Sequence, residues 1–251
     1  MRIARVAVVS VAAFMLIGGA STAAAQTPAA RSGSPWFVDF GFGIAPSING
    51  NISSGAIGTL QGQTTAVLPQ SYGDVYGTGV AYEFGAGYML DDRNEVRGSF
   101  AFQSVSADLR KIGTTANVPL YATFDPYKSI AFQGGYRRYF ADKTERLRPF
   151  GGVNLGIAVV REIDADLAAP DIDQTLNATD FYDRTGALTF GVSGGALYAI
   201  TDRVDLKGEL GFHHTSGLSQ IDGLEGTGLE KVNDSSGRWT LPFTVGARVR
   251  F

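Results

Sequence analysis

Two histidines, a serine and several carboxylates cluster in the segment ELGFHHTSGLSQIDGLEG, residues 209–226. His214 lies two positions before Ser216, and Glu225 follows a short distance along the chain. A histidine base can activate a serine hydroxyl as a nucleophile when a carboxylate orients the imidazole ring. The segment is therefore a candidate hydrolytic site, provided that the element carrying it points these side chains the same way.

Few other chemistries are open to this chain. It has no cysteine, which excludes disulfides, thiolate metal sites and cysteine nucleophiles. Its two histidines, His213 and His214, are adjacent and too few for a zinc site, so we expect neither a metal nor a cofactor. The formal net charge is −3 without a basic stripe, which argues against nucleic acid as a partner.

The amino-terminal residues have the pattern of an export signal. Arg2 and Arg5 precede a short apolar run, and small residues at Ala23 and Ala25 indicate cleavage before Gln26. We therefore expect a signal peptide over residues 1–25 and a flexible leader over 26–35. Residues 36–251 should form the folded domain.

That domain alternates between apolar and small or polar residues with a period of two. In the first stretch, Trp36, Val38, Phe40, Phe42 and Ile44 share one face. The chain has 33 glycines, 16 phenylalanines and 10 tyrosines, a mixture that suits an all-β protein. The same alternation predicts eight strands over residues 36–46, 79–89, 95–105, 129–140, 148–160, 188–200, 204–214 and 239–251.

The connections between these strands alternate in length. Short polar turns occupy residues 90–94, 141–148 and 201–203, whereas the other connections are long. An antiparallel transmembrane β-barrel has this arrangement, with short periplasmic turns and long extracellular loops. A soluble barrel with an apolar interior is the rival fold, but it does not explain the export signal or the asymmetry of the connections.

Aromatic residues mark the two rims of the predicted barrel. Aromatic rings favour the interface between the bilayer and water. Trp239 and Tyr127 begin even-numbered strands and should lie at the outer rim. The periplasmic girdle should consist of Trp36, Tyr88, Phe140, Tyr198 and Phe251.

The opposite face of each strand points into the lumen and carries charge. Eight strands leave an interior just wide enough for side chains, so unpaired charges there would be costly. We expect an ion-pair network that either plugs the barrel or gates a narrow path for ions or small solutes. Its members are Asp39, Glu83, Glu209, Arg97, Arg137, Lys207 and Arg248, with Arg250 at its margin.

The segments RPFGGVNLGIA, SGGALYAITDRVDLKGELGF and VGARVRF resemble the eight-stranded outer-membrane barrel superfamily. That superfamily includes the transmembrane domain of outer membrane protein A and the opacity-type surface proteins. The resemblance implies a barrel in the outer membrane of a Gram-negative bacterium, in contact with lipid and lipopolysaccharide. It also implies that Phe251, with Val249 and Val245, is the signal read by the barrel assembly machinery.

The histidine segment resembles a second family, the outer-membrane lipid A 3-O-deacylases. By that resemblance His214 is the base, Ser216 the nucleophile and Glu225 a candidate acid, all near lipid acyl esters. The chain departs from that family because Gly217, not asparagine, follows the serine. The outward positions of the last strand also offer no carboxylate. An imidazole and a hydroxyl at the membrane interface therefore explain the motif better than an enzyme does.

Two features of the long connections remain open from sequence. Residues 161–186 hold a cluster of carboxylates that could bind calcium or magnesium, but their spacing lacks the pattern of a calcium loop, so a solvated acidic loop is favoured. Residues 118–124 and 64–70 could extend the barrel to ten strands.

The sequence favours a structural or surface-exposed role, in which the long loops mediate adhesion or contact an extracellular ligand. A narrow gated pore is the alternative, and lipid A deacylation is a more distant third hypothesis.

Overall fold

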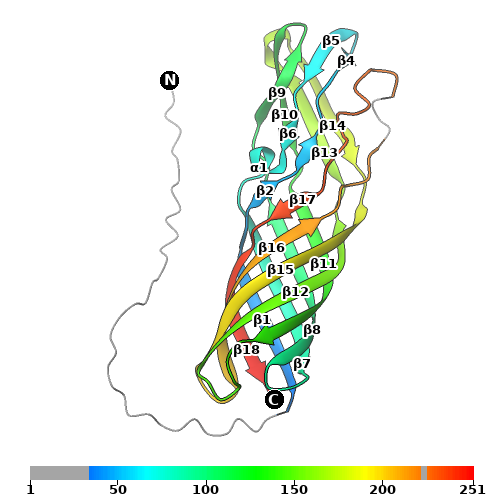
Figure 1. The fold of residues 1–251 in the computed structure, drawn as a ribbon. Coiled ribbons are helices and arrows are strands. Elements are labelled where there is room, and N and C mark those ends of the chain that lie inside the picture. Colours follow the sequence, from blue (N-terminus) through cyan, green and yellow to red (C-terminus); the bar gives the residue numbers. More distant parts are fainter. Residues whose placement is uncertain (1–33, 222–224) are drawn as a thin grey trace, which may run out of the picture.

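A closed barrel of eight antiparallel strands forms the lower part of the molecule (Figure 1). The computed structural model describes residues 34–221 and 225–251, so the predicted signal peptide and most of the leader lie outside the described residues. Neighbouring strands pair in sequence order, and β1 pairs with β18 to close the ring. The strands are β1 (Trp36–Ala45), β7 (Gly79–Met89), β8 (Asn94–Val105), β11 (Tyr127–Tyr139), β12 (Leu147–Val160), β15 (Thr185–Ala199), β16 (Val204–Thr215) and β18 (Phe243–Arg250). The predicted eight-stranded barrel is confirmed.

The alternation read from sequence determines which way each barrel side chain points. Outward positions are large, apolar and exposed, as in Leu155 (58% exposed) and Ile157 (56%) on β12. Most inward positions are small, polar or charged, and the large apolar exceptions at the short-turn end are Phe37, Phe150 and Leu197. An apolar exterior around a polar interior is the arrangement that a lipid bilayer selects. Among the described residues, no helix is long and apolar enough to cross a membrane.

The three short turns lie together at the end of the barrel where the chain ends at Phe251 (Figure 1). Their polar side chains satisfy backbone donors locally. Asp91 Oδ1 accepts hydrogen bonds from the backbone N–H groups of Arg93 and Asn94, at 2.8 and 2.9 Å. Hydrogen bonds to the Asn94 side chain and to these backbone groups lower the pKa of the Asp91 carboxyl.

Three of the long connections form a second β-structure that continues above the barrel. Six strands form a sheet in the order β14-β13-β10-β9-β5-β4. They are β4 (Ala56–Leu60), β5 (Gln63–Val67), β9 (Arg110–Thr115), β10 (Val118–Phe124), β13 (Ile163–Ala169) and β14 (Gln174–Tyr182). We call these strands, with the segments that pack on them, the cap. Residues 118–124 and 64–67 thus belong to the cap and not to a ten-stranded barrel.

Short elements complete the cap and join it to the barrel. They are β2 (Ser47–Asn49), β3 (Asn51–Ser53), β6 (Gln70–Ser71), α1 (Tyr72–Val75), the 3-10 turn η1 (Pro170–Ile172) and β17 (Arg238–Thr240). β2 and β17 pair with each other just above β1 and β18. Pro46 and Pro242 stand between these segments and the barrel strands, where their missing N–H groups interrupt the ladder.

The acidic segment 161–186 is ordered, contrary to the expected solvated loop. β13 and β14 pair as a hairpin around η1, with Ile163 opposite Tyr182 and Ala169 opposite Gln174. Ile163, Ala165 and Ala169 alternate with the acids and are buried, so every second residue holds the segment against the cap. Asp164 and Asp166 thus belong to the less buried half of β13.

An apolar core fills the cap. It contains Ile52, Val67, Tyr72, Val75, Tyr76, Val105, Ile112, Leu120, Ala122, Phe124, Tyr127, Val160, Ile163, Ala165, Ala169, Phe181, Tyr182, Leu218, Leu229 and Val232. The polarity is therefore inverted relative to the barrel, where apolar side chains point outward. Water surrounds the cap and lipid surrounds the barrel, so the apolar side faces inward above the membrane and outward within it.

Tyrosines join the cap core to the top of the barrel. Tyr127 was expected at the outer rim but is 1% exposed, because its position on β11 has the same inward parity as Arg137. Its ring packs against Tyr72 and Tyr76 at centroid distances of 6.1 and 6.0 Å. Burial raises the pKa of the Tyr72, Tyr76 and Tyr182 hydroxyls, which therefore remain neutral.

The connection between β16 and β17 covers the open edge of the cap sheet. Thr59 N, on edge strand β4, donates to Thr227 O at 2.7 Å, and Ser54 N donates to Val232 O at 3.0 Å. Asn233, 2% exposed, donates to Phe181 O and Ile221 O at 3.1 and 2.7 Å. These bonds hold the connection against both ends of the six-stranded sheet.

Candidate functional site: the charged barrel interior

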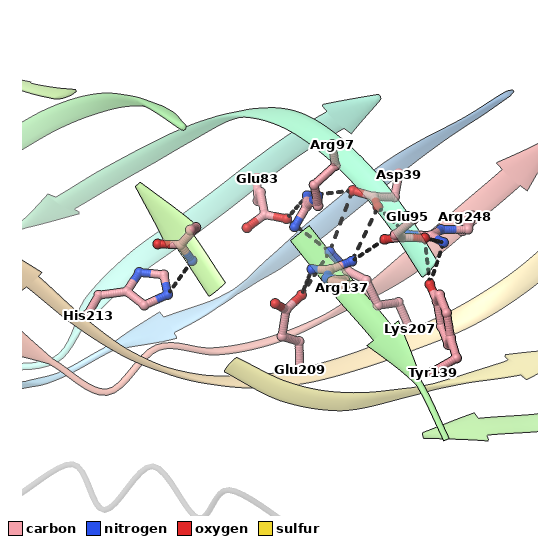
Figure 2. A network of polar contacts seen from close by, with 11 residues as sticks. Asp39, Glu83, Glu95, Arg97, Arg137, Tyr139, Lys207, Glu209, His213 and Arg248 are labelled. Carbon is pink, nitrogen blue, oxygen red and sulfur yellow. Dashed lines mark hydrogen bonds and ion pairs between the residues drawn. The ribbon is translucent and has the colours of Figure 1, made fainter. Parts of the chain in front are cut away.

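Seven charged side chains predicted for the lumen come from six different strands and meet near its axis (Figure 2). Glycines on neighbouring strands leave the room that these long side chains occupy. A Cβ added at Gly85 would lie 2.6 Å from Arg97 Nη2 and 2.7 Å from Asp39 Oδ1. The inward glycines therefore provide the space that the inward charged side chains fill.

Asp39 lies at the centre of the network. Its carboxylate pairs with the guanidinium groups of Arg97 and Arg248, both at 2.9 Å. Arg137 and Lys207 approach the same carboxylate at 3.7 Å each. The Asp39 side chain has no exposed surface, so these four cations replace the water that an ionised carboxylate would otherwise bind.

Glu83 and Glu209 extend the network toward the cap. Glu83 Oε1 accepts hydrogen bonds from Arg97 Nη2 and from Lys207 Nζ, at 2.5 and 3.0 Å. Glu209 pairs with Arg137 and, at 3.4 Å, with Lys207. Each of these cations contacts more than one acid, which links strands on opposite sides of the barrel.

Glu95 and Tyr139 also belong to the network but were missed from sequence. Arg248 Nη1 donates to Glu95 Oε2 at 2.6 Å and to Tyr139 Oη at 2.7 Å. Tyr139 Oη in turn donates to Glu95 Oε2 at 2.7 Å. Glu95 has the inward parity of Arg97, and Tyr139 that of Arg137, so the alternation already contained the signal. The predicted strand 95–105 begins at Glu95, but its inward positions were counted only from Arg97 onward.

The completed network is electrically balanced and blocks the lumen. Four acids (Asp39, Glu83, Glu95 and Glu209) face four cations (Arg97, Arg137, Lys207 and Arg248), and all eight take part in ion pairs. Below it a hollow of about 430 Å³ opens at the short-turn end and reaches Arg248. Above it, beside Arg137 and Glu209, a cavity of only about 10 Å³ remains. Arg250, at the margin, pairs with Asp205 at 2.6 Å.

Two further groups lie in the upper lumen between the network and the cap core. The His213 ring contacts the Asn154 side chain, with Nε2 and Nδ2 3.3 Å apart, and lies apart from the charged cluster (Figure 2). Arg238 is 2% exposed and donates to Ser47 Oγ and Gln103 Oε1, at 2.9 Å each. Its guanidinium stacks 4.1 Å from the centroid of the Tyr127 ring. Arg238 thus marks the boundary between the polar lumen and the apolar cap.

His214 lies on the outward face of β16 and packs among aromatic rings. Its ring centroid is 4.9 Å from that of Phe190 and 4.5 Å from that of Trp239. Ser216 Oγ accepts a hydrogen bond from Leu188 N at 3.1 Å. Within residues 34–221 and 225–251, no hydrogen bond or ion pair joins His214 to Ser216 or to Glu225. The structure does not bring the three candidate catalytic side chains into a triad.

The five predicted girdle residues are exposed near the short-turn end of the barrel. Trp36 and Tyr88 are opposite each other on β1 and β7, with their rings 5.0 Å apart in an edge-to-face arrangement. The Arg146 guanidinium lies over the Tyr198 ring at 5.0 Å. Phe140 and Phe251 are 66% and 59% exposed. Along β18, Val245 and Val249 share the lipid-facing side with Phe251, and their role as an assembly signal stays a prediction.

The described part of the chain contains no group of three or more histidine, aspartate or glutamate side chains arranged to hold a metal ion. The carboxylates of the lumen instead contact guanidinium and ammonium groups. Their arrangement neutralises charge and joins strands, and it leaves no carboxylate set free for a cation.

A family model described as "Outer membrane protein beta-barrel domain" matches residues 10–251. Among solved structures, Neisserial surface protein A is 16% identical, with 87% of this chain and 98% of that chain covered and a TM-score of 0.45. The outer membrane protein OprG from Pseudomonas aeruginosa is 13% identical, with 87% and 97% covered and a TM-score of 0.46. Ail, the attachment invasion locus protein of Yersinia pestis, is 12% identical, with 86% and 98% covered and a TM-score of 0.38. No curated protein matches the chain.

Breaking the network from one side should destabilise the barrel strongly. We expect Arg137→Ala to lower the free energy of unfolding by about 3–5 kcal/mol, because it leaves Glu209 buried without its shortest ion pair. Urea unfolding in lipid vesicles measures the change. The matched control is Arg93→Ala, whose pair with Asp142 is half exposed and should contribute about 0–1 kcal/mol. Equal losses in the two variants would contradict a structural role for the network.

Proposed function

The chain belongs to the outer membrane protein β-barrel domain family, and from this premise we propose that it is a closed barrel that holds a rigid cap at the cell surface for contact with extracellular partners. The family places the chain in the outer membrane. The proposal concerns what the protein does there: the barrel anchors, and the cap makes contact.

The construction of the cap carries this proposal. Its twenty buried apolar side chains form one core that is continuous with the top of the barrel. A barrel that served only as a membrane filler would need no folded structure above the membrane. The cap also exposes single apolar side chains to water, at Ile57 (75% exposed), Leu68 (59%) and Leu109 (66%). Such side chains are available to a binding partner without being required by the core.

The filled lumen supports an anchoring role over the alternative of a gated pore. Conduction would require the ion pairs around Asp39 to separate and the cap core above them to open. Both layers would have to move together. A pore would therefore need two coupled openings.

Lipid A deacylation remains the third hypothesis and receives little support from the geometry. A serine nucleophile needs its hydroxyl within hydrogen-bonding reach of the base. Here the Ser216 hydroxyl accepts a hydrogen bond from the β15 backbone, and the His214 ring packs against Phe190 and Trp239. These contacts suit an aromatic cluster at the membrane interface.

Planar-bilayer recordings test whether the lumen is closed. We expect purified protein to give no steady current, because the charged network and the cap core each seal the barrel. A variant with residues 110–124 replaced by a short turn should also be silent, since the network is intact. Steady channels from the unmodified protein would overturn the anchoring proposal in favour of the pore.

Attachment assays test the surface role. Cells that carry the protein should attach severalfold better than cells without it to surfaces coated with laminin, fibronectin or collagen. Ile57→Ser combined with Leu109→Ser should reduce the gain, because both side chains are exposed on the cap. Lys143→Ala, in a short turn at the opposite end, is the matched control. Unchanged attachment in the cap variant on every coating would count against these positions as the contact surface.

Mass spectrometry of lipid A tests the enzymatic hypothesis. We expect the same acylation pattern in cells that lack the protein, in cells that carry it and in cells that carry His214→Ala, because His214 and Ser216 do not form a catalytic pair. Loss of an acyl chain only in cells with the intact histidine would establish the deacylase reading instead.

A further inference from the structure

Three cations form a row on the lipid-facing side of the barrel, at its cap end. Ser129 pairs with Val160, and Val160 pairs with Thr185, across β11, β12 and β15. The residues just beyond these pairs are Lys128, Arg161 and Arg184, and all three are exposed. Arg161 N donates to Lys128 O at 3.0 Å, which keeps the first two side by side. We call these three residues the cationic row.

The row points outward rather than into the lumen. Val160 and Thr185 are 0% and 5% exposed and face the interior, so the residues next to them in these strands face lipid or water. Within the described ranges, no ion pair involves Lys128, Arg161 or Arg184, whereas every charged member of the lumen network is paired. Asp183 is turned toward the backbone, where its Oδ1 accepts from Arg184 N at 2.6 Å. Three positive charges are thus left available on an acidic protein.

The height of the row matches a lipid headgroup. Phe140, in the girdle at the opposite end, lies twelve residues beyond Lys128 along β11. At about 3.3 Å per residue and a strand tilt of about 45°, the two positions are separated by roughly 28 Å along the membrane normal. The apolar band of such barrels is about 25 Å tall, so the row stands just outside the apolar layer of the outer leaflet.

A hollow with a mixed lining lies directly below the row and measures about 730 Å³. The three cations, Gln103, Ser104 and Ser129 line it together with the apolar residues Val80, Tyr82, Phe102, Ile130 and Val159. Glu162 lines the same hollow and is the one acid there, so the charge of the lining remains positive. A headgroup with several negative charges above apolar chains would complement this surface, whereas a soluble anion would leave the hollow unfilled.

A second, separate hollow lies further down the barrel. It measures about 720 Å³ and lies over β7, β8, β11 and β12, between Phe84, Phe100, Phe132 and Ile157. Gly98 and Gly134 are opposite each other on β8 and β11, and a Cβ at either would meet no atom within 4 Å. Gly134 is six residues below Lys128, roughly 20 Å along the strand. The two hollows lie one below the other along β11 and together extend over a length that suits an acyl chain; we call them the furrow.

We propose that the cationic row and the furrow below it form a binding site for one phosphorylated, multiply acylated lipid of the outer leaflet, with the phosphates on Lys128, Arg161 and Arg184 and an acyl chain along Gly98 and Gly134. The site depends on the membrane location and not on what the cap contacts. It lies outside the lumen network and does not involve His214 or Ser216.

Native mass spectrometry of the full chain, released from micelles titrated with bisphosphorylated lipid A, measures this binding. The variant Lys128→Gln/Arg161→Gln/Arg184→Gln should bind roughly tenfold to a hundredfold more weakly, since each cation near an anionic lipid surface contributes about 1 kcal/mol. The matched control is Lys111→Gln/Arg138→Gln/Lys231→Gln, which removes three exposed cations elsewhere and should bind like the unmodified protein. Lipid A without phosphates should bind the unmodified protein as weakly as the row variant binds the phosphorylated lipid.

A second variant tests the furrow separately from charge. Gly98→Leu/Gly134→Leu fills open space on the lipid-facing side, so it should fold and yet weaken lipid A binding several times over. Equal binding by the row variant and its control would overturn the proposal. It would also be overturned if inorganic phosphate displaced the lipid at equal concentration, because the row would then be a phosphate site without a lipid.

Discussion

The burial of eight charged side chains in a narrow lumen is the constraint on which the rest of this structure depends. A charge in the lumen cannot be left alone, so each acid is matched by a cation and most contacts are shared. The sharing joins β1, β7, β8, β11, β16 and β18, which are far apart in sequence. The inward glycines follow from the same constraint, because the long side chains need their space. The ion pairs in the lumen therefore hold the barrel strands together in addition to the backbone hydrogen bonds between neighbouring strands.

The inversion of polarity between barrel and cap follows from the change of solvent along one continuous structure. β8 leads into β9, β10 into β11, β12 into β13, and β14 into β15. Below the junction the apolar residues meet lipid, and above it they meet one another. Arg238 and the tyrosines around it occupy the level at which the interior changes from charged to apolar. A guanidinium such as that of Arg238, which stacks on an aromatic ring, suits the boundary between the charged and the apolar interior.

The sequence predicted the barrel well and the cap poorly, for physical reasons that differ. Each barrel strand crosses a bilayer, so its alternation is long and regular, and the lumen residues could be placed by parity. Glu95 was missed because it is the first residue of its predicted strand, whose inward face was counted only from Arg97 onward. The cap strands are short, and their apolar residues point inward instead of outward. Segments such as residues 161–186 therefore resemble acidic loops in the sequence. No pattern in the sequence indicates that His214 would be enclosed by Phe190 and Trp239.

The direct passage of barrel strands into cap strands has a mechanical consequence. Hydrogen bonds in an antiparallel ladder run perpendicular to the strands. A force that pulls the cap away from the cell acts along the strands and loads many of these bonds in shear at once. They would have to break together rather than one after another, as they would if a flexible loop were pulled. The force that the cap withstands is therefore set by the hydrogen bonds between the barrel strands and not by the segments that join the barrel to the cap.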